Sequence, residues 1–253
     1  LKHKGIDVNS RLIDKIHGEQ NHNNVLIHEL FPLFNALFYH DYDIIKLLLH
    51  HSQINVNIKS RKLIKTSNGL IDLILDETPL IHAFMKEDYE IVKLLLSHPK
   101  IDVNAVSTFK KNDVNTNFTE NLLCLSIENE KYEVTKLLLK HPNIDVNSIL
   151  ICENKNGTHE EKPALYLAVE KGNEEIVKLL LEHNEIDVNC KYFYNDISKL
   201  EYQQKTVLQY AFEKGNENII KCLLSSPKIN VNLKSKLKKQ NDNSMSFEDI
   251  AQI

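Results

Sequence analysis

Glycine is scarce in this sequence, and its scarcity limits the functions open to the chain. Only 6 of the 253 residues are glycine, and none falls in a GxGxxG or GxxxxGK pattern, so loops that cradle phosphates are not expected. No apolar run approaches the roughly 18 residues that a membrane-spanning helix needs, so no membrane span is expected. The net charge is −4, whereas dedicated nucleic-acid binders carry a basic surplus. The composition therefore disfavours nucleic acid as a partner.

Cysteine is also rare. The 4 cysteines form no CxxC pair, and they are Cys124, Cys152, Cys190 and Cys222. We interpret them as reduced thiols of a cytoplasmic protein, with a disulfide framework as the alternative. The chain opens with Leu1 and has no apolar segment typical of a signal peptide, so we expect it to be a fragment of a longer chain.

What the sequence has in abundance is an internal repeat. The tetrapeptide Ile-Asp-Val-Asn or Ile-Asn-Val-Asn begins at Ile6, Ile54, Ile101, Ile144, Ile186 and Ile229. Ten residues before each of the last five stands a block of the type Ile-Val-Lys-Leu-Leu-Leu, beginning at Ile44, Ile91, Val134, Ile176 and Ile219. Eight residues further upstream lies a small residue, namely Ala36, Ala83, Ser126, Ala168 or Ala211. Both offsets hold in all five copies, so only the connecting segments vary in length.

The clearest copy opens with Thr78-Pro-Leu-Ile-His-Ala, continues with Glu90-Ile-Val-Lys-Leu-Leu-Leu and closes with Ile101-Asp-Val-Asn. This order of blocks resembles the ankyrin repeat. HEAT and armadillo arrays are the alternative on repeat length alone, but a fixed unit with variable inserts and the Asp-Val-Asn turn argue against them. The resemblance implies an all-α repeat solenoid of stacked helix pairs with extended β-hairpin fingers. Within this copy, we expect Thr78 to cap the first helix and Asp88 to cap the second. We expect Asn173 and Asn216 to cap the second helix in later copies.

The repeat boundaries predict a single array over residues 1–253. It consists of a partial repeat over 1–30, complete repeats over 31–77, 78–120, 121–162, 163–205 and 206–245, and a partial repeat over 246–253, which matches the opening of a first helix. The long connectors predict hairpins rather than disordered loops. In Leu63–Leu75 the pair Asn68-Gly69 lies between apolar runs, and Asn156-Gly157 follows another such run. This is a strong short-range hairpin signal.

A histidine follows the leucine triplet in successive repeats, at His3, His51, His98, His141 and His183. A metal site would need several rings within about 2 Å of one ion. Equivalent positions in stacked repeats are separated by about 8–10 Å, so we expect no metal site and no cofactor. These histidines are instead expected to bond the open carbonyls at the helix ends.

No serine, cysteine or carboxylate has a partner at a spacing that indicates catalysis, so we expect neither an enzyme nor a small-molecule substrate. Two further sets of residues are assigned to packing. Tyr42, Tyr89 and Tyr132 share one register next to the start of the second helix, which is usually a packing site between helices, with a binding stripe as the alternative. Cys124 and Cys222 replace apolar positions of the unit and are expected to fill the core.

The resemblance implies that a protein partner of unknown identity binds along the concave face, through the fingers and the exposed end of each first helix. The variable pairs at that end grade from apolar to charged: Phe38-Tyr39, Met85-Lys86, Glu128-Asn129, Glu170-Lys171 and Glu213-Lys214. Aromatic residues and methionine are enriched at interface centres, which favours the N-terminal half. The predicted site is Phe38, Tyr39, Met85, Lys86, Leu63, Ile64, Leu70 and Ile71, with the aromatic finger Tyr192, Phe193 and Tyr194 as a competing site. Alternatively, Phe38 and Tyr39 bury against their neighbours.

We therefore expect a non-catalytic scaffold for protein–protein interaction. Two alternatives stay open at this point. One is a structural component of a large assembly, such as a cytoskeletal array. The other is the regulatory array of an enzyme whose catalytic domain lies outside this fragment. The fold alone does not choose among them, because a fold does not imply a particular ligand.

Overall fold

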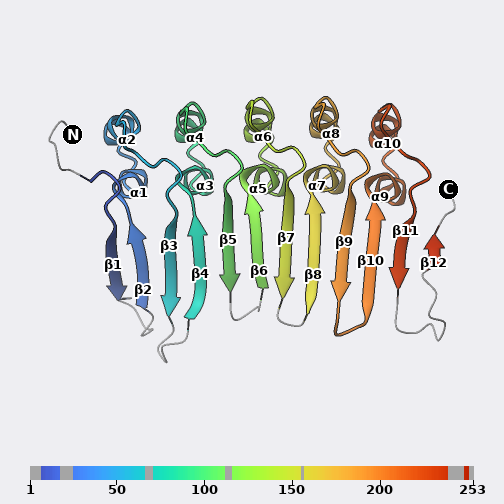
Figure 1. Cartoon of the computed structure of the whole chain (residues 1–253), viewed down its shortest axis with the longest axis horizontal. Coiled ribbons are helices and arrows are strands. Elements are labelled where there is room, and N and C mark those ends of the chain that lie inside the picture. Colours follow the sequence, from blue (N-terminus) through green and yellow to red (C-terminus); the bar gives the residue numbers. More distant parts are fainter. Residues whose placement is uncertain are drawn as a thin grey trace. The chain divides into compact units, whose positions relative to one another are not determined.

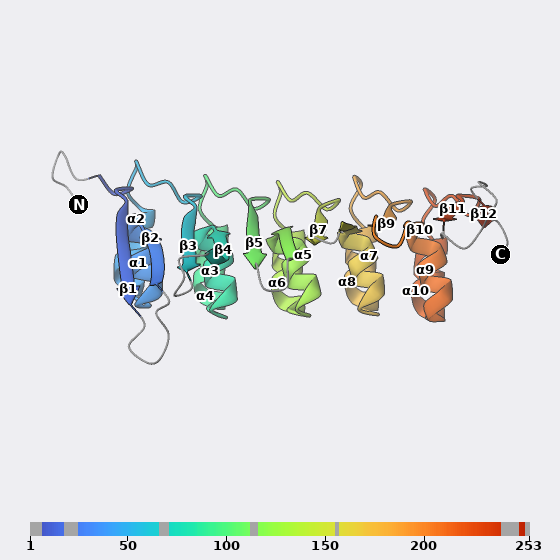
Figure 2. The ribbon, with the colours of Figure 1, turned by 90° about the horizontal axis from the view of Figure 1, so that it is seen from below.

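The computed structural model describes residues 7–17, 25–65, 71–111, 116–154, 157–238 and 248–250. Two compact units, Leu1–Asn117 and Phe118–Ile253, make up the chain. In each unit, the first helix of every pair lies between the strands and the second helix (Figure 1). Figure 2 shows the helix pairs of each unit side by side.

Unit 1 contains two helix pairs and five described strands. The pairs are α1 (Pro32–Phe38) with α2 (Tyr42–Leu49), and α3 (Pro79–Met85) with α4 (Tyr89–Leu96). The strands are β1 (Leu12–His17), β2 (Val25–Leu30), β3 (Ser60–Lys65), β4 (Ile71–Glu77) and β5 (Val106–Lys111). Each strand pairs antiparallel with the next one along the chain, both within a finger and between neighbouring fingers.

Unit 2 follows the same plan with three helix pairs. They are α5 (Leu122–Glu128) with α6 (Tyr132–Leu139), α7 (Ala164–Glu170) with α8 (Glu174–Leu181), and α9 (Val207–Lys214) with α10 (Glu217–Leu224). Its strands are β6 (Thr116–Asn121), in which the boundary falls, β7 (Ile149–Asn154), β8 (Thr158–Pro163), β9 (Lys191–Asp196), β10 (Glu201–Thr206), β11 (Ser235–Lys238) and β12 (Glu248–Ile250). From β7 onwards each strand pairs antiparallel with its successor.

The predicted helix pairs and fingers are confirmed. The turn at Asn68-Gly69 lies outside the described residues, whereas Gly157 adopts φ +83°, as its predicted turn requires. One segment differs from expectation. Residues 246–253 were expected to open a first helix, but Glu248–Ile250 form β12 and pair with β11.

The predicted N-cap residues form hydrogen bonds at the starts of their helices. The Thr78 hydroxyl accepts the Ile81 N–H at 3.3 Å, and Pro79 occupies the first turn. The side chains of Asp88, Asn173 and Asn216 accept the N–H three residues on, at 3.2, 2.8 and 3.1 Å. Each bond satisfies a backbone donor that has no partner inside the helix.

An asparagine ladder joins consecutive repeats within each unit. The Asn9 carboxamide donates to the Gln53 carbonyl and accepts the Asn55 N–H, so it grips the backbone of the next turn. Three further asparagines make the same two bonds, at distances between 2.7 and 2.9 Å. Asn57 bonds the Lys100 carbonyl and the Asp102 N–H, Asn147 bonds the Glu185 carbonyl and the Asp187 N–H, and Asn189 bonds the Lys228 carbonyl and the Asn230 N–H. These residues end the recurring tetrapeptide, so the motif marks the joint between repeats.

The turn between the two helices of a pair adopts the left-handed conformation in every repeat. Gly172 and Gly215 occupy it with φ +71° and +69°, whereas His40, Glu87 and Glu130 adopt φ between 52° and 57° at the same place. Only glycine enters this region without steric cost.

Replacing Gly172 with alanine should therefore lower the free energy of unfolding by about 1–2 kcal/mol. Apart from residue 172 and its chain neighbours, no described atom lies within 4 Å of the added Cβ, so the loss would come from the backbone alone. The converse change, Glu130→Gly, should alter stability by less than about 1 kcal/mol, because relieved strain is offset by a more flexible unfolded chain. Urea unfolding of both variants measures this, and a harmless Gly172→Ala would contradict it.

Candidate partner-binding surface

The ends of the first helices in unit 1 expose large apolar side chains. Phe38 and Met85 end α1 and α3 and are 51% and 59% exposed, and Tyr39 is 72% exposed. The rings of Phe38 and Tyr39 meet edge to face, with centroids 5.2 Å apart. The alternative that these two side chains bury against neighbours is therefore wrong. Lys86, the C-cap of α3, is also exposed.

The register of the fingers shows which strand residues share a face. Lys62 lies opposite Leu75, and Leu75 lies opposite Phe109, so these three share one face of the sheet in unit 1. Ile64 lies two residues from Lys62 and is on that face, whereas Leu63 is on the other. Leu63 and Ile64 are both half-buried. Of the other predicted finger residues, Leu70 lies outside the described residues, as does the side chain of Ile71.

The shared face borders α3. Glu77 follows Leu75 by two residues, lies on the same face and contacts His82 of α3 at 3.0 Å. In unit 2, the residues equivalent to Glu77 and Met85 touch directly: Lys162 with Glu170, and Lys205 with Glu213. We name this set of residues the unit 1 palm: Phe38, Tyr39 and Met85 at the ends of the first helices, and Ile64, Leu75 and Phe109 on the strands.

Asp88 fixes the turn beside Tyr39. Its carboxylate accepts the Ile91 N–H, lies 3.0 Å from the His40 ring, and accepts the Tyr42 hydroxyl at 2.8 Å. Burial acts to raise the pKa of Asp88, but these three hydrogen bonds outweigh it and the pKa lies below its ordinary value. The packing prediction for Tyr42 is wrong, because this side chain is 42% exposed and ties one repeat to the next. Tyr89 and Tyr132 are half-buried.

The glutamates at the equivalent helix ends in unit 2 are each paired with a lysine. Lys205 Nζ lies 2.6 Å from Glu213, Lys162 Nζ lies 3.2 Å from Glu170, and Lys171 Nζ lies 3.3 Å from Glu128. Because each lysine already has a carboxylate, a partner would have to break these pairs to use the charges. The gradient seen in the sequence thus separates exposed apolar side chains at the helix ends of unit 1 from glutamates in ion pairs at the helix ends of unit 2.

The competing aromatic finger packs on its own neighbours. Tyr192 stacks on the buried Tyr166 with centroids 4.8 Å apart. Phe193, on the opposite face, contacts His159 of the preceding finger and Tyr202 of its own. The Tyr194 hydroxyl donates to Asp196 at 3.3 Å. All three side chains are half-buried, so they offer a partner less surface than the exposed Phe38, Tyr39 and Met85 do.

A carboxylate pair marks the start of unit 2. Burial raises the pKa of Glu120 to about 7, and the negative charge of Glu128 adds to the rise. Sequence reasoning missed this feature, although Glu120 stands where the next two repeats have Lys162 and Lys205. In the two later repeats, the lysine at this position attracts the glutamate at the end of the first helix. In the first repeat of unit 2, Glu120 at the same position repels the corresponding Glu128.

Because the folded-state pKa of Glu120 is raised, its ionisation opposes folding at high pH and has no effect below its ordinary pKa of 4.5. Glu120→Gln should therefore unfold at higher urea concentration than the unmodified chain at pH 8, and the two should converge as the pH falls through 7 towards 4.5. The same change at the exposed Glu182 controls for net charge. A pH-independent difference at Glu120 would contradict the prediction.

The recurring histidines do bond the backbone, but not in the predicted direction. The Nδ1 atoms of His51, His98 and His141 accept the N–H two residues on, at 3.2–3.3 Å, so the prediction that they donate to helix carbonyls is wrong for these three. His3 lies outside the described residues. Within the described ranges, no three His, Cys, Asp or Glu side chains are grouped so that they could hold a metal ion.

The cysteines are all free thiols. Cys124 is fully buried, as predicted for a core residue, whereas Cys222 is half-buried. Burial raises the pKa of Cys152 to about 11 and that of Cys190 to about 12. These two thiols are therefore protonated at neutral pH and are poor nucleophiles.

Stacked helix pairs with hairpin fingers define a repeat solenoid. The model for ankyrin repeats (3 copies) matches residues 3–107, 60–149, 105–192 and 145–235, so the chain belongs to the ankyrin repeat family. Such repeats generally bind proteins and are typically not catalytic. A comparison with curated proteins gives no match. Within the described part of the chain, every helix is too short or too polar to cross a membrane.

Proposed function

We propose that this chain is a non-catalytic cytoplasmic scaffold that binds a protein partner through the unit 1 palm. One observation carries the proposal. The first-helix ends of unit 1 expose Phe38, Tyr39 and Met85. In unit 2 the positions of Phe38 and Met85 are glutamates paired with lysines, and the position of Tyr39 is Asn129, Lys171 or Lys214. Aromatic residues and methionine are enriched at the centres of protein interfaces, and glutamate and lysine are depleted there.

The local structure also prepares Tyr39 for binding. Its neighbours His40 and Tyr42 both bond Asp88 of the next repeat, and its ring rests against Phe38. A side chain held in this way loses less conformational freedom on binding, which favours affinity. The half-buried Ile64, Leu75 and Phe109 extend the apolar surface along the fingers.

The test begins with cross-linking and mass spectrometry to identify a partner, which is then titrated against two variants. Tyr39→Ala should weaken binding by roughly 2 kcal/mol or more, because interface hot spots are few and often aromatic. Glu213→Ala should change binding by under about 1 kcal/mol, mainly through the association rate and its salt dependence. Circular dichroism must show both variants folded. If Glu213→Ala weakens binding more than Tyr39→Ala does, the placement on unit 1 is wrong.

A further inference from the structure

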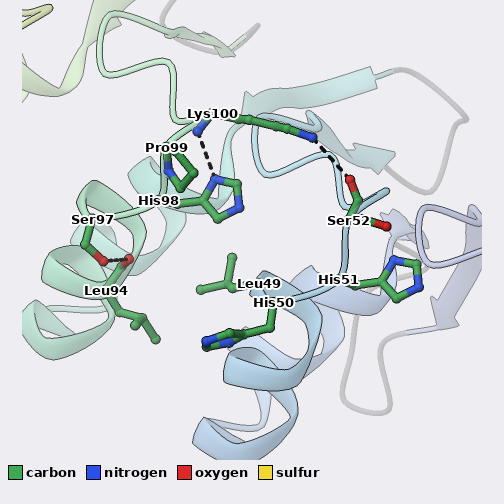
Figure 3. Close-up of a pocket in the computed structure, with 9 residues that line it drawn as sticks. All are labelled: Leu49, His50, His51, Ser52, Leu94, Ser97, His98, Pro99 and Lys100. Atoms are coloured by element: carbon green, nitrogen blue, oxygen red, sulfur yellow. Dashed lines mark hydrogen bonds between the residues drawn. The ribbon is translucent and has the colours of Figure 1, made fainter. Parts of the chain in front are cut away.

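A pocket of about 380 Å³ lies between the C-terminal ends of α2 and α4 (Figure 3). The second helices form the layer farther from the strands, so this pocket is separate from the fingers (Figure 1). Leu49 and Leu94 give it an apolar wall, and His98 and Lys100 stand on its rim. None of its nine lining residues is a carboxylate, whereas three are histidines and one is a lysine.

The positive charge of Lys100 is not neutralised by a carboxylate within the described residues. Its Nζ donates to the Ser52 carbonyl at 3.1 Å, which is a neutral acceptor. The corresponding pocket in unit 2, between α6 and α8, has about the same volume but is lined by both signs of charge. There Lys136 lies 2.8 Å from Glu175 and 3.1 Å from Glu133. The pocket in unit 2 thus has lysines balanced by carboxylates in its own lining, whereas the equivalent pocket in unit 1 has a lysine and no carboxylate.

Hydrogen bonding fixes what His98 can offer to a ligand. Its Nδ1 accepts the Lys100 N–H at 3.2 Å, so in the neutral ring the proton lies on Nε2 and that atom is a donor. Nε2 is on the side of the ring away from this bond, whereas the ring of His51 points away from the pocket (Figure 3). The pocket therefore presents two N–H donors, from His98 and Lys100, and one acceptor, because Nδ1 of His50 donates to the Lys46 carbonyl and leaves Nε2 of the neutral His50 ring without a proton.

The helix ends do not cancel this preference. The C-terminus of a helix carries partial negative charge on its open carbonyls. At the end of α2 the Leu48 carbonyl accepts the His51 N–H, and the Lys46 carbonyl accepts from the backbone and the ring of His50. At the end of α4 the Leu94 carbonyl accepts the Ser97 hydroxyl at 2.7 Å. These internal donors occupy several of the carbonyls at the two helix ends and so reduce their repulsion of an anion.

We propose that this pocket binds a glutamate or aspartate side chain from an acidic segment of a protein partner. The carboxylate would accept from Lys100 Nζ and His98 Nε2, and the aliphatic part of the side chain would contact Leu49 and Leu94. A charge-assisted bond of this kind is stronger than one between neutral groups. The pocket adds a second contact region to the unit 1 palm and does not depend on it.

The test uses the whole chain and two fluorescent peptides, an octamer of glutamate and an octamer of glutamine, followed by anisotropy at low salt. The glutamate peptide should bind, and the glutamine peptide should bind at least tenfold more weakly. Lys100→Gln should weaken glutamate-peptide binding at least fivefold. The matched variant Lys140→Gln, in the pocket of unit 2, should change it less than twofold.

Nuclear magnetic resonance gives a second reading that does not depend on a variant. The ring resonances of His98 should shift on addition of the glutamate peptide, and those of His183, in the pocket of unit 2, should not. Equal losses from Lys100→Gln and Lys140→Gln, or equal binding of both peptides, would overturn the proposal. So would saturable binding of inorganic phosphate without binding of the glutamate peptide, because the pocket would then select phosphate. Circular dichroism checks that both variants are folded.

Discussion

Replacing Leu138 with alanine is expected to lower the free energy of unfolding by about 2–5 kcal/mol, the usual range for a leucine truncated in a packed core. Leu138 is 0% exposed and lies in α6, which packs against α5 and α8. The truncation removes buried apolar contacts and leaves a cavity that neighbouring helices can fill only in part. Because each repeat contacts only its neighbours, the loss also weakens the coupling between repeats.

The control is an exposed leucine from the equivalent leucine triplet of another repeat. Leu47 in α2 is 59% exposed, so Leu47→Ala should cost under about 1 kcal/mol. Urea unfolding followed by circular dichroism measures both variants. Equal losses would show that the assigned core does not stabilise the fold.

The second large effect is expected at Glu77. This carboxylate is 2% exposed, and its Oε1 lies 2.6 Å from Lys62 Nζ and 3.0 Å from Nδ1 of the equally buried His82. Burial acts to raise the pKa of Glu77, but the hydrogen bond and charge of His82 and the charge of Lys62 outweigh it, and the pKa is lowered. Removing one member of a buried ionic group leaves the others without compensation, so Glu77→Ala should cost about 3–5 kcal/mol.

The adjacent carboxylate provides a matched control. Asp76 forms two bonds with Arg61, at 2.7 and 2.9 Å, but the Arg61 side chain is 52% exposed, so Asp76→Ala should cost under about 1 kcal/mol. The pH dependence should also separate the two. Since the folded-state pKa of Glu77 is lowered, its contribution is present above its unfolded pKa and is lost as the pH falls through the folded value. The cost of Glu77→Ala, measured by urea unfolding, should therefore shrink in acid. A cost no larger than that of Asp76→Ala at neutral pH would contradict the prediction.

Local rules were sufficient for much of this fold. A cap needs only the residues of one helix start, so Thr78 and Asp88 could be assigned from their neighbours, and both assignments are confirmed. The fingers could be predicted from the length and patterning of the connectors. The end of the chain could not, because the similarity of residues 246–251 to a repeat opening competes with pairing along β11.

Interactions between repeats were harder to infer. The Tyr42 hydroxyl bonds Asp88, 46 residues along the chain, and nothing in the spacing identifies that partner. The histidines were assigned to the right place but with the wrong bond, because the turn places the backbone N–H two residues on within 3.2–3.3 Å of Nδ1. At the candidate site, the exposure of Phe38, Tyr39 and Met85 followed the sequence gradient. The packing of Tyr192 and Phe193 depended on side chains from other strands.

The asparagine ladder affects how the number and order of repeats can change during evolution. Each joint connects a carboxamide to a backbone carbonyl and a backbone N–H of the following turn, so both hydrogen bonds go to backbone atoms. Every residue except proline carries both backbone groups. A gene segment that encodes one repeat could therefore be duplicated, deleted or exchanged, and the new neighbours would still find the same attachment points. The surface positions are then free to diversify, because the joint that holds the repeats together places no demand on them.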